Sequence, residues 1–191
     1  MGSHDGNFSL KSSINIIRAH MHGAHDPIWA YIWKALVPQC VRFFLWLAGH
    51  DRIMSNSNMF SRGLTTDPSC RNCLGVEKTS LHILWDCPLA RVIWEGTIPG
   101  HLHNMFFLLP LRPWLGYNLK PSCDILENWP TSFAIAVWKL WKLRNKRVFE
   151  DPNFTPYRPQ KTIKKQSKEI LKALVSNPSK TLSSKSEILI R

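Results

Sequence analysis

Apolar residues recur at helical spacing along most of the chain, and strand-like alternation is scarce, so the sequence predicts a mainly α fold. Pro27 suits the start of one helix, and Pro38 ends that helix and opens a second through VRFFLWLAGH. The stretch SNSNMFSRG predicts a short helix with Ser55 or Asn56 as its cap and Gly63 as its stop.

The longest helical pattern is NWPTSFAIAVWKLWKLRNKRVF, which predicts an amphipathic helix. Its apolar face carries Ala134, Val137, Trp138, Trp141 and Val148, and a second face carries Lys139, Lys142 and Lys146. Before it, Pro88 can start a helix over LARVIW, and the segment 96–128 is interrupted by Gly and by four Pro, which predicts short helical turns. After it come a Pro-containing linker, a basic helical candidate (TIKKQSKEILKALV) and a Ser/Lys tail expected to be disordered.

These patterns divide the chain into four segments. Residues 1–26 form a lead-in segment, 27–97 a small helical domain, 98–150 a helical connector, and 151–191 a basic, partly disordered linker and tail. We therefore expect a small helical domain around a cysteine-bearing hairpin, followed by a long amphipathic helix and a disordered basic tail.

The charge of the chain favours a polyanionic partner. Its formal net charge is +12, and residues 139–191 carry fourteen Lys or Arg against four acids, which indicates nucleic acid before a membrane. No signal peptide is evident, and the apolar runs are too short to cross a bilayer. We expect an intracellular protein, in the nucleus in preference to the cytoplasm, with no small-molecule substrate.

The segment CRNCLGVEKTSLHILWDC carries the candidate chemistry. Cys70, Cys73, His82 and Cys87 form a C-x2-C-x8-H-x4-C set, which offers the four N/S donors of a tetrahedral structural zinc site and leaves no position for a catalytic water. Gly75 can ease the chain out of the C-x2-C turn. The alternative is a group of buried thiols and a core histidine, but four soft donors within eighteen residues are less easily accidental.

Other cysteines and histidines have simpler interpretations. Cys40 and Cys123 lack nearby ligand partners, so we expect both to be core thiols. His20, His22 and His25 are interpreted as an incidental loop cluster in preference to a second metal site.

Beyond the ligand spacing, the aromatic frame of this region resembles a known family. The stretch VPQCVRFFLWLAGHDRIMSNSNMFSRGLTTDPSCRNCLGVEKTSLHILWDCPLARVIW looks like the reverse transcriptase zinc-binding domain of plant LINE-type (non-LTR) retrotransposons. Besides the four ligands, the residues that fit the family pattern are Trp33, Lys34, Pro38, Arg42, Phe43, Phe44, Leu45, Trp46, Arg62, Gly63 and Trp94. WLGYNL and FAIAVWKLWKLRNKRVF are similar to the connector that leads to an RNase H domain. The resemblance implies that 27–97 is this domain and that it holds one structural zinc ion.

One position departs from the family pattern. The family usually has an acidic residue four before the ligand histidine, and here that position is Lys78, followed by Thr79. An acid there would complement the helix carrying His82, so its loss predicts a cost of a few tenths to ~1 kcal/mol with intact ligands.

The sequence offers no candidate catalytic site. No Asp-Asp pair typical of a polymerase palm is present, and no RNase H carboxylates follow Phe149, so we expect a module that is not an enzyme. The resemblance implies template RNA or target DNA as a partner. Candidate phosphate contacts are Arg52, Arg62 and Arg71 near the hairpin, and Lys139, Lys142, Arg144, Lys146 and Arg147 on the long helix.

Two alternatives remain open. The charges can form an ordinary solvated basic face. The module can also be structural, docking onto the polymerase or RNase H domain of a parent polyprotein from which it has been orphaned, and a large exposed apolar patch would favour that reading. We expect the pairs Trp29/Trp33 and Trp138/Trp141 to anchor the core in preference to stacking on bases.

Overall fold

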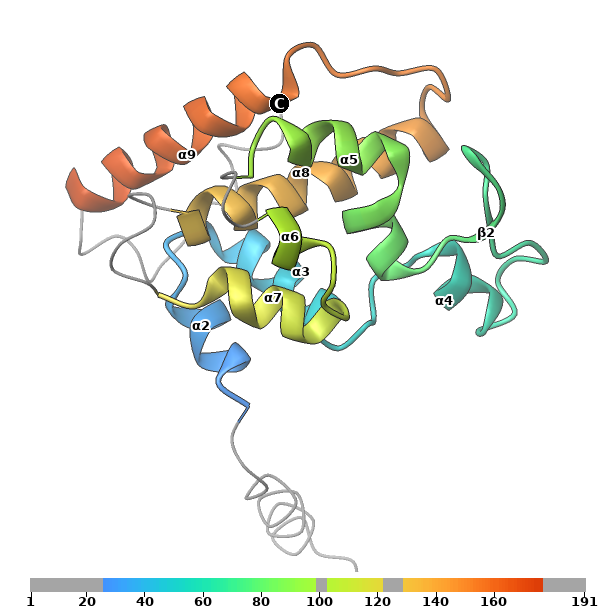
Figure 1. Cartoon of the computed structure of the whole chain (residues 1–191), viewed down its shortest axis with the longest axis horizontal. Coiled ribbons are helices and arrows are strands. Elements are labelled where there is room, and N and C mark those ends of the chain that lie inside the picture. Colours follow the sequence, from blue (N-terminus) through green and yellow to red (C-terminus); the bar gives the residue numbers. More distant parts are fainter. Residues whose placement is uncertain (1–25, 99–102, 122–128, 177–191) are drawn as a thin grey trace, which may run out of the picture.

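Regular structure in this chain is almost entirely helical (Figure 1). A computed structural model describes residues 26–98, 103–121 and 129–176. The helices are α2 (Ile28–Lys34), α3 (Gln39–Gly49), α4 (Asn56–Phe60), the π-helix η1 (His82–Asp86), α5 (Pro88–Glu95), α6 (His103–Phe106), α7 (Leu111–Leu119), α8 (Trp129–Phe149) and α9 (Pro159–Ser176). The strands β1 (Ser69–Cys70) and β2 (Cys73–Glu77) form an antiparallel hairpin. The predicted fold class, a mainly α domain around a cysteine-bearing hairpin, is confirmed.

The helix starts follow the prolines and caps in the sequence. Pro27 and Pro38 directly precede α2 and α3, and Pro88 opens α5, where its missing N–H is not needed. Ser55 caps α4, because its Oγ accepts a hydrogen bond from the Asn58 backbone N–H at 3.1 Å. These starts agree with the sequence predictions, because each signal acts within one helical turn.

Helix α8 is the element around which the fold is built. It packs against α3, α7, α9 and η1. The five consecutive residues 133–137 are all buried, so this half of α8 is covered on every side. The predicted amphipathic pattern therefore describes only the second half of α8, where Leu140 and Arg144 point inward and Lys142 is exposed.

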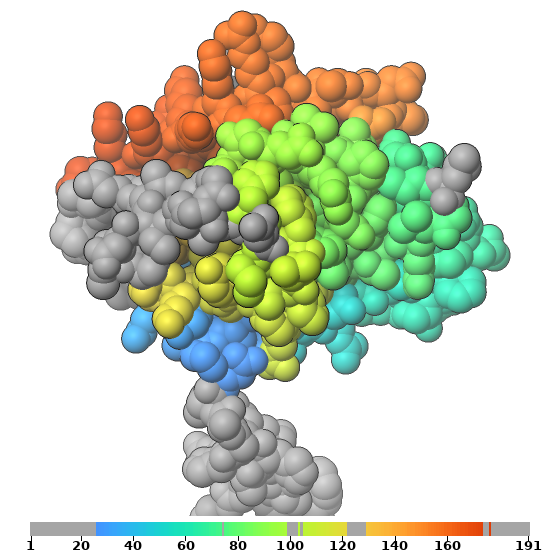
Figure 2. All heavy atoms as spheres, viewed as in Figure 1, coloured from blue at the N-terminus to red at the C-terminus, as the bar shows by residue number. Residues whose placement is uncertain are grey.

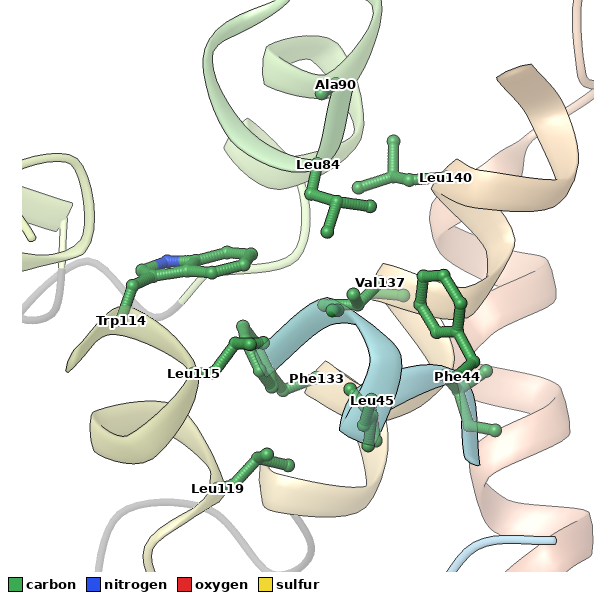
Figure 3. Close-up of a cluster of buried hydrophobic side chains, with 14 of the residues drawn as sticks. Phe44, Leu45, Leu84, Ala90, Trp114, Leu115, Leu119, Phe133, Val137 and Leu140 are labelled. Carbon is green, nitrogen blue, oxygen red and sulfur yellow. The ribbon is translucent and has the colours of Figure 1, made fainter. Parts of the chain in front are cut away.

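The core beside α8 is rich in aromatic side chains. Trp94, Phe106, Trp114 and Phe133 are each fully buried, and their rings meet edge-on or tilted at centroid distances of 4.8 to 6.2 Å, except for the stacked pair Trp94 and Phe133 at 5.7 Å. Figure 3 shows Trp114 with aliphatic side chains from α3, α7, α8 and η1 converging on the same interior. Each such large side chain contributes about 1.5–3 kcal/mol when it is withdrawn from water.

Helix α9 is the basic helix predicted in the last segment of the chain, and it packs along α8. Ile163 and Ser167 are buried, and Ile170 packs against the core. Its lysines at 161, 164, 165, 168 and 172 are exposed. The expected disorder of the tail concerns residues 177–191, which lie outside the described residues.

Two expected core residues prove to be on the surface. Trp33 is 40% exposed, because the short helix α2 directs Ile28 and Ile32 inward instead. Cys40 is exposed as well, because Val41, Phe44 and Leu45 occupy the inner face of α3. The other three tryptophans of that prediction, at 29, 138 and 141, do pack against the core. Cys123 and the histidine cluster at 20–25 lie outside the described residues.

Among the residues with described positions, no helix is long and apolar enough to span a membrane.

Candidate metal centre

The β1–β2 hairpin brings the first two cysteines together. Cys70 and Cys73 are direct partners across the antiparallel pair, so only Arg71 and Asn72 form the turn between them. Gly75 has a φ of +71°, a left-handed conformation that side-chain-bearing residues adopt at a cost. The two thiols are therefore presented from one tight turn, as the C-x2-C spacing predicts.

The third and fourth candidate ligands lie at the two ends of the π-helix η1. The Cys87 backbone N–H donates to the His82 carbonyl at 3.0 Å, which closes the wide i to i+5 turn of a π-helix. The start of this helix is capped by Thr79, whose Oγ1 accepts a hydrogen bond from the His82 N–H at 3.0 Å. Thr79 thus caps the start of this helix, a role that an acidic residue at position 78 would have supported.

The four donor atoms form one compact cluster. The ligand atoms of Cys70, Cys73, His82 and Cys87 all lie within 4.8 Å of one another. The Sγ atoms of Cys73 and Cys87 are 4.0 Å apart, close to the ~3.8 Å that a tetrahedron with zinc–sulfur bonds of about 2.3 Å requires. Cys70, His82 and Cys87 are each at most 5% exposed. The cluster is thus a closed site able to hold one metal ion.

The imidazole of His82 is prepared for a metal by its surroundings. Its Nδ1 lies 2.7 Å from Asp86 Oδ1, although neither atom has a hydrogen bond of acceptable geometry among the described residues. This close contact fits a metal-ligating histidine, which usually turns one ring nitrogen toward a carboxylate and the other toward the ion. Nε2 is buried without a partner, which would be costly in a purely structural histidine.

The thiols also fit a metal ion electrostatically. Burial and the neighbouring thiols of Cys87 and Cys70 raise the pKa of Cys73 to about 12. Burial likewise raises the pKa of Cys87. Clustered thiolates are unfavourable here without a cation, and a bound divalent ion reverses that balance. The residues present therefore fit zinc, which would contribute folding free energy without a catalytic step.

Lys78 lies beside this cluster, which the sequence alone did not reveal. Its side chain is 6% exposed and shares a small recess with Cys87 and Arg144. Burial lowers the pKa of Lys78, whereas the thiols of Cys70 and Cys87 act in the opposite direction. The position that departs from the family pattern thus places a lysine beside the proposed ligand Cys87.

The candidate phosphate contacts differ in exposure. Arg52, Arg62, Arg71 and Lys142 are exposed, and Lys139, Lys146 and Arg147 are half-buried. Arg147 Nη2 reaches Asn72 Oδ1 at 3.5 Å, at the outer limit of a hydrogen bond. This contact brings the end of α8 to the tip of the zinc hairpin, next to Arg71. The hairpin and α4 form one end of the molecule, which Figure 2 shows as the teal region.

Arg144 has a different environment from the other basic residues of α8. It is 5% exposed, and its Nη2 donates to Asn56 Oδ1 at 3.0 Å. Its guanidinium also lies over the Trp141 ring at 5.1 Å, and burial lowers its pKa. Arg144 therefore joins α8 to α4 and has little surface left for a phosphate.

Besides the position of Lys78, two contacts were not predicted from the sequence, and only one of them had a local signal. Asp86 follows His82 by four residues, so a helix through both predicts their contact. The contact of Arg144 with α4, which the sequence analysis interpreted as a phosphate contact instead, carries no local signal, because Asn56 and Arg144 are far apart in the chain.

Comparisons with known proteins agree with this geometry. The family model for zinc-binding in reverse transcriptase matches residues 8–94. A protein of Arabidopsis thaliana described as "Putative ribonuclease H protein" is 32% identical over 155 residues, covering 77% of this chain and 24% of that relative. The chain thus spans about a quarter of the relative's length. No solved structure gives a significant match.

The zinc-binding domain of this family is non-catalytic. Residues 8–94 belong to the family of zinc-binding domains of retrotransposon reverse transcriptases.

Proposed function

We propose that this chain is a non-catalytic zinc module of a LINE-type retrotransposon polyprotein and that it assists binding of template RNA or target DNA. Cys70, Cys73, His82 and Cys87 are the proposed ligands of one structural zinc ion. All four tetrahedral positions are filled by protein donors, which leaves no position for a reactive water. This favours a supporting role in which the metal shapes a surface.

The observation that carries the nucleic-acid proposal is the contact between Arg147 and Asn72. It joins residues 75 positions apart and brings the cations of α8 to the exposed Arg71 at the hairpin tip. Cations gathered on one surface release counterions when they neutralise phosphates, which gives salt-dependent and largely sequence-independent affinity. The net charge of +12 supports the same class of partner.

The proposed contacts follow from exposure. Arg71 and Lys142 are exposed and are the primary candidates, whereas Lys139, Lys146 and Arg147 are half-buried and contribute less. Burial and the neighbouring charge of Lys142 also lower the pKa of Lys139. Arg52 and Arg62 are exposed on either side of α4 and extend the candidate surface. Arg144 is left out, because its guanidinium is engaged inside the fold.

The test is binding of a labelled single-stranded oligonucleotide by the zinc-bound chain across a salt series. We expect affinity to fall as salt rises, and Arg71→Gln to lower the log–log slope by about 0.7. Lys34→Gln on α2 is the matched control, because it removes the same charge from an exposed position at another part of the molecule (Figure 1). Equal slopes for Arg71→Gln and Lys34→Gln, or binding insensitive to salt, would contradict the proposal.

A second candidate function, docking to a polymerase or RNase H domain, is favoured by an exposed apolar face on α2, α3 and the link between them. Its members are 37–53% exposed and are Trp33, Leu36, Phe43, Trp46 and Leu47. Side chains of this type dominate the energetics of protein interfaces. If the zinc-bound chain binds no nucleic acid but binds an adjoining polymerase or RNase H domain, with Phe43→Ser abolishing that complex, docking is the function.

A further inference from the structure

Lys78 is held rigidly beside the metal centre. Its backbone N–H donates to the Pro68 carbonyl at 2.8 Å, and its carbonyl accepts from the Ser57 N–H at 3.3 Å. These bonds fix the residue between the end of β2 and the start of α4, and its side chain is 6% exposed. Lysine is almost never buried to this degree unless its charge is compensated.

No carboxylate compensates Lys78 in the part of the chain that the structure describes. The ion pairs found there are His82–Asp86, Arg112–Asp26 and Lys165–Glu169. The neighbouring cations Arg144 and Arg71 oppose the charge of Lys78. The groups that favour its charged form are the thiols of Cys70 and Cys87.

The recess that Lys78 shares with Cys87 and Arg144 is too small for an external anion. Its volume of about 30 Å³ suits a water molecule or two, not a phosphate group. Arg144 directs its two terminal nitrogens to Asn145 and Asn56. Cys87, one of the four proposed ligands, lines the same recess as Lys78, so this lysine is buried beside the proposed ligand cluster.

The charge of a filled site explains why a cation is needed. A zinc dication, three thiolates and a neutral imidazole sum to one net negative charge (+2 − 3 + 0 = −1). Zinc enters as three thiol protons leave, so filling the site makes it more negative by one charge. In a low-dielectric interior, a fixed cation nearby stabilises that change.

We propose that the side chain of Lys78, which shares its recess with Cys87, is the internal counter-ion of the zinc–thiolate centre. This inference rests on the proposed ligand set of Cys70, Cys73, His82 and Cys87. The positive charge of Lys78 balances the net negative charge of the zinc–thiolate centre. This stabilises the zinc-bound form and lowers the nucleophilicity of the sulfurs. Lys78 thus does for the thiolates what a carboxylate does for a ligating histidine.

The test is the zinc affinity of the full chain, measured by competition with a chromophoric chelator at fixed pH. We expect Lys78→Met to weaken zinc binding about 10- to 100-fold, the usual effect of losing a group that supports metal ligands. Lys78→Arg keeps the charge and should retain most of the affinity. Lys164→Met is the matched control, because it removes one exposed lysine charge on α9 and should bind zinc as the unaltered chain does.

A spectroscopic readout separates a charge effect from a packing effect. In the cobalt(II)-substituted chain, loss of the neighbouring cation should move the sulfur-to-metal charge-transfer band to lower energy in Lys78→Met but not in Lys164→Met. Zinc-bound thiolates should also react faster with iodoacetamide in Lys78→Met. If Lys78→Met fails to fold, Lys78→Gln removes the charge with a polar side chain in the same comparison.

The outcomes distinguish this inference from the proposed function. If the unaltered chain binds zinc, but affinity, band position and alkylation rate are the same in Lys78→Met and Lys164→Met, Lys78 is not the counter-ion. If the unaltered chain binds no zinc, the ligand set itself is wrong. Weakened zinc binding together with a shifted band in Lys78→Met supports the inference whether or not the chain binds nucleic acid.

Discussion

Trp94 connects the metal centre to the aromatic core, and replacing it should destabilise both. Its indole Nε1–H donates to the Leu84 carbonyl in η1 at 2.7 Å, and its side chain is fully buried. Trp94→Phe removes that donor, and an unsatisfied buried carbonyl costs about 1–3 kcal/mol. The smaller ring also leaves a cavity of roughly 40 Å³, which adds ~1 kcal/mol at about 24 cal/mol per Å³. We expect a total loss of ~2–4 kcal/mol.

The assay is urea unfolding of the zinc-bound chain, followed by far-UV circular dichroism. Trp33→Phe is the matched control, because it makes the same chemical change at a side chain that is 40% exposed, where we expect a change within about 0.5 kcal/mol. Trp94→Phe should also weaken zinc binding, since Leu84 lies in the same helix as His82. A loss below about 1 kcal/mol for Trp94→Phe, or equal losses for both variants, would refute the reasoning.

Three further changes test separate parts of the structure. Cys73→Ser, like treatment with a chelator, should unfold the hairpin around residues 68–94, because ligand binding energy in such sites is largely folding energy. Limited proteolysis measures this unfolding. A Cys73→Ser variant with unchanged metal content and thermal stability would contradict the ligand assignment. Gly75→Ala should cost about 1–2 kcal/mol in urea unfolding, because its φ is +71° and nothing crowds the added Cβ; an unchanged midpoint would mean that the turn adapts. Ser55→Ala should cost about 0.5–2 kcal/mol in the same assay through loss of the α4 cap, whereas Ser55→Thr, which keeps a capping hydroxyl, should recover most of it.

The features that the sequence predicted correctly are those with local signals. The C-x2-C turn, the proline-led helix starts and the Ser55 cap each act within a few residues, so the pattern contains the physics that determines them. Cys70 and Cys87 are farther apart in the sequence, but the number and type of donors in this segment predict that they meet in one tetrahedral cluster.

The features that the sequence could not predict depend on which helices surround a segment. Trp33 and Phe44 have similar local patterns, but α8 covers Phe44 through Trp138 and Trp141, whereas the ring of Trp33 meets that of Phe43 at the surface and stays 40% exposed. Burial of α8 over 133–137 on every side likewise requires α3, α7, α9 and η1 together. Hydrophobic periodicity reports a face, not the number of neighbours that cover it.

The same long-range contacts explain why nucleic-acid binding should depend on zinc even though the ion touches no phosphate. The hairpin meets α8 through Arg147 and Asn72, and α4 meets α8 through Asn56 and Arg144. Loss of the metal leaves Cys73 and Cys87 buried with raised pKa values and leaves Lys78 buried beside uncharged thiols, so the hairpin has no charge balance in its docked position. We therefore expect Arg71 to separate from the cations of α8 when the metal is lost, which would divide the candidate surface. On this reasoning, chelation should reduce the salt slope by about the Arg71 contribution, because the α8 cations remain on the helical body.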